Sequence, residues 1–369
     1  MAVAASSLTV APVAADWAQF RGNPSLDGVA TEVPVLELQP VWSFETDDAI
    51  ESTAAISAGT VFVGSLDGSL YALALADGSL RWKYPTDAEI KSSPSIRDGL
   101  VFFGDENGVF HAVDAASGAA RWTFETDGGI ISSANFARDL VLFGSYDQFL
   151  YALDRKTGAL RWKIETDGYV HSTPAIAGEH VLVSGCDGYF RKVDLADGTE
   201  AGKLQLGSYV ASSMAVKGDT AFTGTFDNEV IAVDWARDEL VWRYNHPDKN
   251  FPFYSSPAVT DKVVVIGGRD KLLHALEPET GELLWTFPTR GRIDPSPIVA
   301  GDRVYAISGN GDLFALRLAD GEKLWSYELA APVTASPAIG EGHLVVGTAD
   351  GAVLAFGPRI DSPAAEGAP

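Results

Sequence analysis

A tryptophan that returns about every 40 residues constrains this chain more than any other feature. The cassette around it is clearest at Ala152, Asp154, Gly158 and Trp162, which fit the pattern A-x-D-x-x-x-G-x-x-x-W. The tryptophan recurs at Trp42, Trp82, Trp122, Trp162, Trp242, Trp285 and Trp325. Gly202 stands where one further Trp is expected, and one unit is longer than the others by three residues. Such a repeat predicts an array of similar units, so no domain boundary belongs inside it.

Each unit contains four short β-patterned runs, which we name A, B, C and D. Gly, Asp or Asn turns separate the runs at intervals near ten residues, as expected for meandering antiparallel sheets. No segment with helical periodicity competes with them. The A runs are predicted to begin near Ile50, Ile90, Ile130, Val170, Val210, Phe253, Ile293 and Val333, which gives eight units.

The two ends of the repeat complement each other. The last unit has runs A, B and C but no D run, whereas Val41–Glu45 is a D run without a unit of its own. Pairing the N-terminal run into the last unit closes a ring and removes its exposed sheet edges. The sequence therefore predicts an all-β fold: an eight-bladed β-propeller of four-stranded antiparallel blades, closed by an N-terminal strand.

The predicted organisation has four parts. Residues 1–15 form a tail or remnant signal segment, and residues 16–40 form a stretch that we name the N-terminal clasp. Residues 41–357 form the propeller, and residues 358–369 form a disordered tail. The clasp begins with Asp16-Trp17-Ala18-Gln19-Phe20-Arg21-Gly22-Asn23, which lies outside the repeat, and we expect it to pack across one end of the fold.

The cassette residues have structural roles in this interpretation. The Asp side chain can accept backbone N–H bonds in the C-to-D turn, and the Gly supplies the positive φ that the turn needs. The Trp lies on run D, where its apolar face can fill the space between blades and its indole N–H can find a carbonyl. We therefore assign the repeated Trp residues to blade docking.

The cassette resembles the tryptophan-docking repeat of the pyrroloquinoline quinone (PQQ)-like propeller superfamily, from Val41 to Phe356. It is complete at Ala112 to Trp122 and Ala152 to Trp162, whereas Ala74, Glu277 and Arg317 replace its Asp elsewhere. The opening D-W-x-Q-F-R-G-N is similar to a segment that precedes the propeller in many exported PQQ-like proteins. The resemblance implies one of two branches: quinoprotein dehydrogenases, or non-catalytic propellers similar to the outer-membrane assembly lipoprotein BamB.

For the dehydrogenase branch, the resemblance implies an adjacent Cys pair over the cofactor, a calcium or lanthanide site of Glu, Asn and Asp, and a catalytic Asp. Cys186 is the only cysteine, so it cannot form that pair or an internal disulfide. No Glu/Asn/Asp set aligns with the expected metal site. We therefore predict no catalytic residues, no metal site and no bound cofactor, with PQQ and calcium as the alternative.

One position in each unit departs from the repeat. The residue after the first apolar position of each A run should line the axial channel, and it varies as Glu51, Lys91, Ile131, His171, Ala211, Tyr254, Asp294 and Thr334. Because the fold does not dictate these residues, Glu51, Lys91, His171, Tyr254 and Asp294 are the candidates for binding a ligand or partner. The alternative is that they simply line a water-filled channel.

Charge limits the partners. The net charge is −23, with 50 acidic and 27 basic residues and no basic patch, so nucleic acid should be repelled. No apolar run approaches the ~20 residues of a membrane span. We expect a monomer that contacts protein partners through one propeller face.

The first fifteen residues leave the location open. They are small and apolar, and Val13-Ala14-Ala15 fits a signal-peptidase site, but no positively charged segment precedes them. A truncated signal would place the protein outside the cytoplasm, in the periplasm or secreted, whereas a plain tail would leave it cytoplasmic.

Two hypotheses about function follow. The first is a non-catalytic, BamB-like scaffold for protein interactions in the cell envelope. The second is a protein that binds PQQ or another small ligand at the channel mouth, with quinoprotein-type oxidoreductase activity if it is an enzyme.

Overall fold

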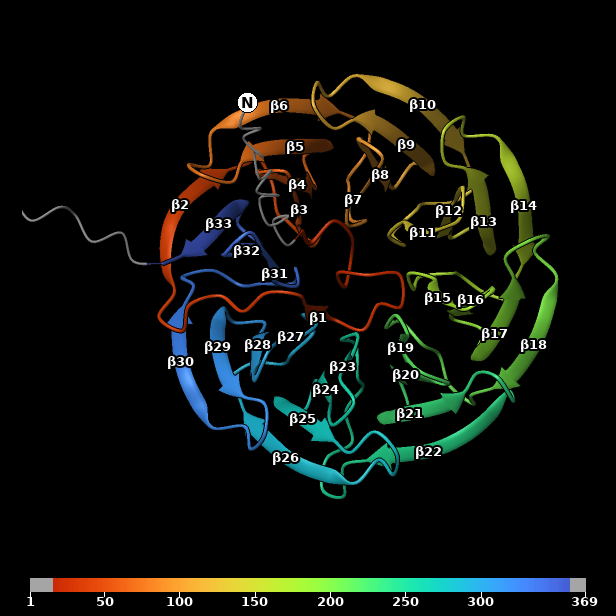
Figure 1. The fold of residues 1–369 in the computed structure, drawn as a ribbon, viewed down its shortest axis with the longest axis vertical. Coiled ribbons are helices and arrows are strands. Elements are labelled where there is room, and N and C mark those ends of the chain that lie inside the picture. Colours follow the sequence, from red (N-terminus) through yellow and green to blue (C-terminus); the bar gives the residue numbers. More distant parts are fainter. Residues whose placement is uncertain (1–15, 359–369) are drawn as a thin grey trace, which may run out of the picture.

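The computed structural model describes residues 16–358 of the 369-residue chain. The signal-like segment 1–15 and residues 359–369 of the predicted tail lie outside the described residues. Eight sheets stand around a central axis like the blades of a propeller, and the chain visits them in order around the ring (Figure 1). The predicted eight-bladed β-propeller is confirmed.

Each blade runs outward from the axis through strands A, B, C and D. The A strands are β3 (Ala55–Ser57), β7 (Ser95–Arg97), β11 (Asn135–Ala137), β15 (Ala175–Ala177), β19 (Ala215–Lys217), β23 (Ala258–Val259), β27 (Ile298–Ala300) and β31 (Ala338–Gly340). The B strands are β4 (Thr60–Ser65), β8 (Leu100–Gly104), β12 (Leu140–Gly144), β16 (His180–Ser184), β20 (Thr220–Gly224), β24 (Val264–Gly267), β28 (Arg303–Ile307) and β32 (His343–Gly347). The C strands are β5 (Ser69–Ala74), β9 (Val109–Asp114), β13 (Phe149–Asp154), β17 (Tyr189–Asp194), β21 (Glu229–Asp234), β25 (Leu272–Leu276), β29 (Asp312–Arg317) and β33 (Ala352–Gly357). The D strands are β6 (Leu80–Pro85), β10 (Ala120–Glu125), β14 (Leu160–Glu165), β18 (Glu200–Gln205), β22 (Glu239–Asn245), β26 (Leu283–Pro288), β30 (Lys323–Glu328) and, in blade 8, β2 (Gln39–Glu45).

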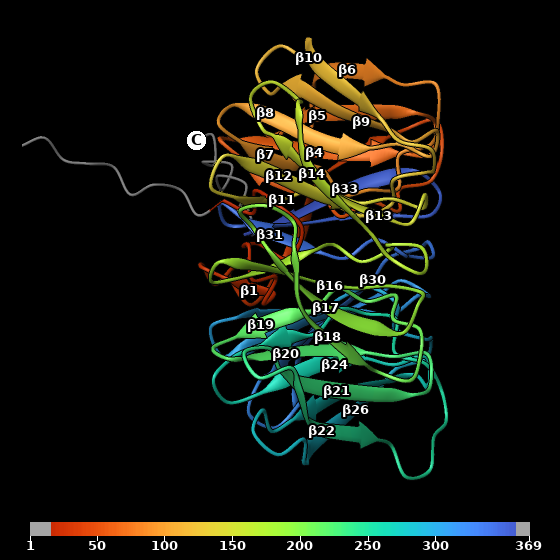
Figure 2. The ribbon, with the colours of Figure 1, turned by 90° about the vertical axis from the view of Figure 1, so that its right-hand side faces the viewer.

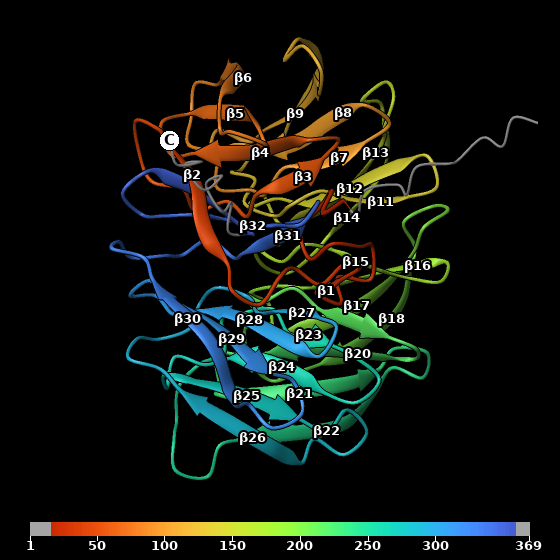
Figure 3. The same ribbon diagram turned by 60° about the vertical axis from the view of Figure 1, so that its left-hand side comes forward.

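The ring is closed by the two ends of the repeat. Strand β2 pairs antiparallel with β33, with Glu45 opposite Ala352 and Gln39 opposite Gly357. In Figure 3 the red-orange β2 lies beside the blue strands of blade 8, although the two segments are far apart in the sequence. The closure predicted from the orphan D run is therefore present, and β2 begins slightly earlier than the predicted propeller boundary at residue 41.

The predicted starts of the A strands were wrong. Strand β3 begins at Ala55 and not near Ile50, and the other A strands are displaced in the same way. The preceding residues are held by side-chain bonds and by single backbone bonds, such as Ile50 N–H to the Thr348 carbonyl, instead of by a strand ladder. The Ser52 hydroxyl donates to the Gly64 carbonyl at 2.8 Å and accepts the Gly64 N–H at 2.9 Å. A sequence pattern cannot separate this extended segment from a strand, because both alternate buried and less buried residues.

Burial explains the patterning of the strands. Strands B and C lie inside each blade and are almost wholly buried, as in β12, where all of Leu140–Gly144 is buried. The D strands form the outer rim and alternate in exposure. Most buried apolar side chains belong to clusters that join neighbouring blades, so the core of the protein is a ring and not a single centre.

Tryptophan joins each of several blades to the next. Trp162 of β14 covers Gly198 of the following blade so closely that a Cβ there would lie 2.7 Å from the indole. The Trp162 indole N–H donates to the Leu195 carbonyl at 3.2 Å. The same bond is made by Trp42, Trp82, Trp242 and Trp285. The cassette glycine thus has two roles, because it adopts a positive φ and leaves room for the face of the indole ring.

The junction between blades 4 and 5 is built differently, because it carries Gly202 in place of the Trp. Lys192 of β17 reaches across this junction and donates to the Trp235 carbonyl at 3.0 Å, the acceptor that an indole would use. Its ammonium also lies 2.8 Å from Asp238 Oδ1. Asp238 stands at the cassette glycine position, and one of its oxygens lies 2.3 Å from where a Gly202 Cβ would be. A lysine and an aspartate therefore replace the tryptophan and the glycine together.

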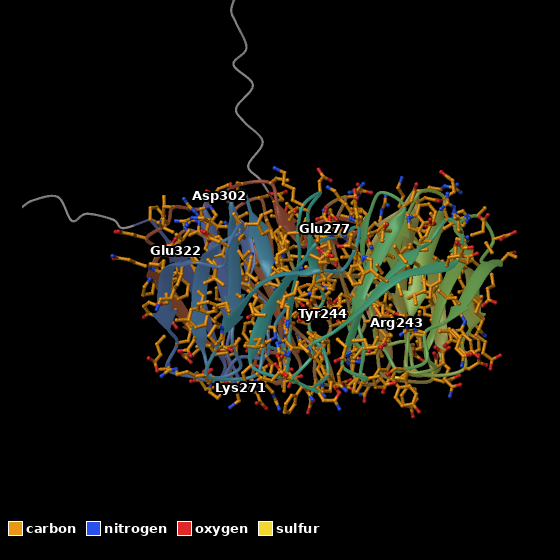
Figure 4. The ribbon with its side chains drawn as sticks, turned by 90° about the horizontal axis from the view of Figure 1, so that it is seen from below. Arg243, Tyr244, Lys271, Glu277, Asp302 and Glu322 are labelled. Atoms are coloured by element: carbon orange, nitrogen blue, oxygen red, sulfur yellow. The ribbon has the colours of Figure 1, made fainter. Side chains whose placement is uncertain are left out.

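The strands run between two faces of a disc (Figure 2). We name the side of the D-to-A and B-to-C connections the mouth face, and the side of the A-to-B and C-to-D turns the clasp face. Figure 4 shows Lys271, from a B-to-C turn, at one face and Glu277, Asp302 and Glu322, from the other turns, toward the opposite face. None of residues 16–358 form a helix with the length and hydropathy of a membrane span.

Candidate functional site

An axial cavity of about 370 Å³ opens at the centre of the ring, and we name it the axial funnel. All eight irregular positions singled out in the sequence line it: Glu51, Lys91, Ile131, His171, Ala211, Tyr254, Asp294 and Thr334. They come together because each occupies the same place in its blade, just before strand A at the axis. Phe20 of the N-terminal clasp also lines the funnel.

Below this ring the funnel carries a second ring that sequence reasoning missed. It consists of Thr53, Ser93, Ser133, Thr173, Ser213, Ser256, Ser296 and Ser336. The backbone N–H of each residue from Thr53 to Ser296 donates to the hydroxyl of the next blade's member, at 2.9 to 3.1 Å. The signal was present as the second hydroxyl residue of the A-run motif. Because these bonds join neighbouring blades, the ring holds the wall of the funnel in place.

His171 is paired inside the funnel wall. Its Nδ1 lies 2.7 Å from the hydroxyl of Tyr146, which comes from a B-to-C turn. Burial lowers the pKa of His171, with Glu106 acting in the opposite direction. Burial also raises the pKa of Tyr146 to about 12, with smaller contributions from Cys186 and Glu106. Both groups are therefore neutral near pH 7 and form an uncharged hydrogen-bonded pair.

Lys91 is tied to two carboxylates. Its ammonium lies 2.9 Å from Glu106 Oε1 and 3.1 Å from Glu89 Oε2. Burial by itself would lower the pKa of Lys91, but the hydrogen bonds to Glu106 and Glu89 outweigh it and raise the pKa. This group carries one positive and two negative charges, so its side of the funnel is acidic.

Asp294 and Tyr254 lie in a group with two arginines that sequence reasoning missed. Arg269 donates to both oxygens of Asp294, at 2.8 and 3.1 Å, and its guanidinium lies 3.6 Å from the centre of the Tyr254 ring. Arg292 Nε lies 3.0 Å from the second oxygen of Asp294. Such fork-shaped pairing is strong and fixes the side chains. Two cations share one anion here, so this side of the funnel is basic.

Glu51 remains an exposed carboxylate at the rim of the funnel. The structure thus gathers the five candidate residues around one cavity but does not bring them into one hydrogen-bonded constellation. Lys91, His171 and Asp294 each have separate partners from neighbouring loops. Sequence spacing could identify the shared ring but not these partners.

The funnel residues do not fit a calcium-bound quinone. Among residues 16–358, no group of three or more His, Cys, Asp or Glu side chains is placed to hold a metal ion. Both carboxylate oxygens of Asp294 are paired with arginines. Of the candidate positions that line the funnel, this leaves Glu51 as the unpaired carboxylate within residues 16–358. Cys186 lies in a B-to-C turn, half-buried, and burial raises the pKa of its thiol. These residues therefore lack the carboxylate donors that a calcium-bound quinone requires.

The mouth face around the funnel carries a sector of aromatic side chains, which we name the aromatic sector. Tyr169, Tyr209 and Phe251 lie in three consecutive D-to-A connections and are 50%, 60% and 49% exposed. Tyr146 stacks on Tyr169, with 4.8 Å between the ring centres. Phe226 packs edge-on against Tyr254 at 4.7 Å. The sector therefore spans blades 3 to 6 beside the funnel.

Relatives among known proteins share this architecture. The family model described as outer membrane protein assembly factor BamB matches residues 37–135, 107–250 and 226–360. An outer membrane protein assembly factor BamB from Shewanella oneidensis is 34% identical over 137 residues, which are 33% of this chain and 35% of that protein. The one from Salmonella typhimurium is 31% identical over 88 residues, which are 21% of this chain and 22% of that protein. The aligned parts thus span 35% and 22% of the length of these two curated relatives.

Solved structures agree in fold. BamB from Moraxella catarrhalis superposes with a TM-score of 0.75 at 19% identity, covering 87% of this chain and 100% of that one. Quinohemoprotein alcohol dehydrogenase from Comamonas testosteroni gives a TM-score of 0.80 at 13% identity, covering 94% of this chain and 81% of that one. Both likenesses show the fold alone, whereas the family model covers nearly the whole propeller. The chain therefore belongs to the family described as outer membrane protein assembly factor BamB and is a PQQ-like repeat propeller.

Proposed function

We propose that this protein is a non-catalytic scaffold of the cell envelope that binds protein partners through its mouth face. Membership of the BamB family and the BamB relatives support the assignment to outer membrane protein assembly. The funnel residues fit a non-catalytic role, since Lys91, His171 and Asp294 each pair with separate partners and do not form one connected constellation. The protein acts as a monomer outside the cytoplasm in this proposal.

The aromatic sector is the observation that carries the proposal. Tyr and other aromatic residues are enriched in protein interfaces, where a few of them supply most of the binding energy. Apolar side chains that gather on one exposed face mark interaction sites, and three aromatic residues lie here in consecutive loops of the same face. Among residues 16–358, the other exposed large apolar side chains lie on the D strands, at their edges or in the clasp.

The sector is also held in shape before any partner arrives. The Phe226 N–H donates to the Tyr209 carbonyl at 3.0 Å, which ties the D-to-A connection of Tyr209 to a B-to-C turn. The Cys186 N–H donates to the Tyr169 carbonyl in the same way, at 3.0 Å. A surface of this kind loses little conformational entropy on binding, and this favours affinity.

Site-specific photo-crosslinking tests the proposal. A photoreactive phenylalanine replaces Tyr169, Tyr209 or Phe251 in the full chain, expressed in the cell envelope of a Gram-negative host. Leu284, 46% exposed on strand β26 of the outer rim, provides the matched control position. We expect the three sector positions to capture the same envelope protein and the control to capture none. Equal capture from the rim, or none from the sector, would refute the proposal.

A second candidate function is the binding of a small acidic ligand in the axial funnel, with PQQ as one such ligand. The observation that favours it is Arg292, whose side chain is 58% exposed at the funnel although its Nε lies 3.0 Å from Asp294. Titration with PQQ, with and without calcium, tests it by the melting temperature. A saturable increase that Arg292→Ala abolishes would support this function, and an unchanged melting temperature at millimolar ligand would count against it.

A further inference from the structure

The N-terminal clasp contacts the blades one after another in the order of the chain. Carbonyl groups of the clasp accept backbone N–H bonds from the A strands of six blades: Trp17 from Ile56 (2.9 Å), Ala18 from Ile96 (2.6 Å), Pro24 from Ile176 (2.8 Å), Ser25 from Val216 (2.8 Å), Asp27 from Val259 (2.7 Å) and Gly28 from Val299 (3.0 Å). In Figure 1 this red segment crosses and curves around the centre of the ring.

Side chains complete the circuit at the two remaining blades. In blade 3, Asn135 accepts from Gln19 Nε2 at 3.0 Å and donates to the Pro24 carbonyl at 2.8 Å. In blade 8, the Gly342 N–H donates to Glu32 Oε1. The segment from Trp17 to Glu32 therefore touches all eight blades in a single turn around the axis. Only a complete ring offers every one of these contacts.

The donors on the blades would have no strand partner without the clasp. Each A strand is the innermost strand of its sheet, so its second edge faces the axis. An N–H group left unpaired in a confined channel carries a desolvation cost, and an open strand edge is exposed to unwanted pairing. The clasp removes both problems at six positions. Strand β1 (Val29–Ala30) extends this pairing as a parallel strand beside β27.

Two apolar anchors hold the clasp on opposite sides of the ring. Trp17 is 1% exposed and belongs to a cluster made by blades 7, 8 and 1. Leu26 is also 1% exposed and belongs to a cluster made by blades 4 and 5. The two anchors therefore fix the clasp on both sides of the axis.

The centre of the clasp contains a buried cation that is incompletely paired. Arg21 is 1% exposed and donates to the Pro257 carbonyl at 2.9 Å, but its Nε has no hydrogen-bond partner among the described residues. Burial lowers its pKa to about 9, with Asp27 acting in the opposite direction. A buried, incompletely paired cation favours release into water. The clasp should therefore open at a lower free energy than the strand ladders.

We propose that the N-terminal clasp is a latch that docks on the axis only after all eight blades have formed and then opens as one unit, while the blades stay folded. Opening turns the axial funnel, which Phe20 of the clasp lines, into a channel through the ring. It also presents six A-strand edges on the clasp face. The strand β2 closure at the rim is separate from this latch, because β2 pairs with β33 alone.

Native-state hydrogen exchange on the full chain, resolved to single amides, tests the latch. The six amides that bond to the clasp should exchange with protection factors that agree within about threefold and lie at least about tenfold below those of β2 and β33. Protection factors that differ widely among the six, or that equal those of β2 and β33, would overturn the inference. This measurement needs no variant, so it decides the question even if a substitution prevents folding.

Gly28→Ala provides the matching perturbation. Gly28 has φ +69° and a Cβ there would lie 1.9 Å from Arg21 Nη2, so the substitution strains the backbone and forces the buried guanidinium aside. Gly99→Ala is the control, because Gly99 has φ +75° and a Cβ there would meet nothing within 4 Å. We expect Gly28→Ala to lower the protection of all six amides at least about tenfold and Gly99→Ala to leave them unchanged. Loss confined to Val259 and Val299, beside the substitution, would show independent contacts and refute the latch.

Discussion

Replacing Lys192 with alanine should destabilise the propeller at the junction of blades 4 and 5, and the structure indicates by how much. The Lys192 side chain is almost wholly buried, and its ammonium lies 2.8 Å from Asp238 Oδ1 and donates to the Trp235 carbonyl at 3.0 Å. Removing one partner of a buried ion pair costs about 3–5 kcal/mol. Because the Asp238 side chain is 26% exposed, water can reach it in part, and we expect a loss of about 2–4 kcal/mol in the free energy of unfolding.

Equilibrium urea unfolding, followed by circular dichroism, measures this loss. The decisive comparison is the triple variant Lys192→Ala, Gly202→Trp and Asp238→Gly, which rebuilds the tryptophan and glycine docking of the other junctions. We expect the triple variant to recover to within about 1 kcal/mol of the natural protein, because the three positions act as one unit. Gly202→Trp alone should instead destabilise, since Asp238 oxygens lie 2.3 and 2.5 Å from a Cβ at that position.

Two results would refute this reasoning. A loss below about 0.5 kcal/mol for Lys192→Ala would show that the ion pair contributes no more than a surface pair. A triple variant no more stable than Lys192→Ala would show that lysine and aspartate do not stand in for the indole docking.

Other predictions concern one ordinary junction and the funnel wall. Trp162→Ala should cost about 3–5 kcal/mol in urea unfolding, because it empties the space against Gly198 and removes the bond to the Leu195 carbonyl; a loss below about 1 kcal/mol would contradict the docking role. Burial lowers the pKa of folded His171, so the unfolded chain binds the extra proton as the pH falls through about 6.5, and stability should decrease from pH 7.5 to pH 5.5. His171→Gln should reduce this slope by up to about 1.4 kcal/mol per pH unit, and an unchanged slope would show that His171 is not its source. Tyr146→Phe removes the 2.7 Å bond to His171 and should cost about 1–2 kcal/mol at pH 7.5, whereas an unchanged stability would argue against a bond of any strength.

The fold was predictable because the same sequence pattern recurs in every unit. A single Trp carries little information, but Asp, Gly and Trp at a fixed spacing are compatible with few architectures. The missing D run of the last unit and the extra D run before the first unit together specify how the ring closes. The ring of candidate residues was predictable for the same reason. A position fixed within a repeat is fixed in space once the repeats surround an axis.

The partners of those residues were not predictable. Arg269 and Arg292 meet Asp294 from two different connections, and Glu106 reaches Lys91 from a B-to-C turn. Connections differ from blade to blade and obey no repeat, so their side-chain contacts depend on the folded backbone. The aromatic sector was missed likewise, because Tyr169, Tyr209 and Phe251 are distant in the sequence and share a surface only in the ring.

The sequence by itself determined the number of blades, their strand order, the closure by β2 and the ring at the axis, because all of these follow from periodicity. Tertiary structure alone decided what the exceptions mean. In the sequence, Gly202 is only a missing Trp, and the structure shows that Lys192 and Asp238 fill its place. The N-terminal clasp is only a stretch outside the repeat, and the structure shows that its carbonyl groups accept bonds from six A strands. The physical reason is that a repeat encodes the contacts within a unit and with the next unit. A residue that departs from the repeat is instead compensated by whichever group the fold brings within hydrogen-bonding distance of it.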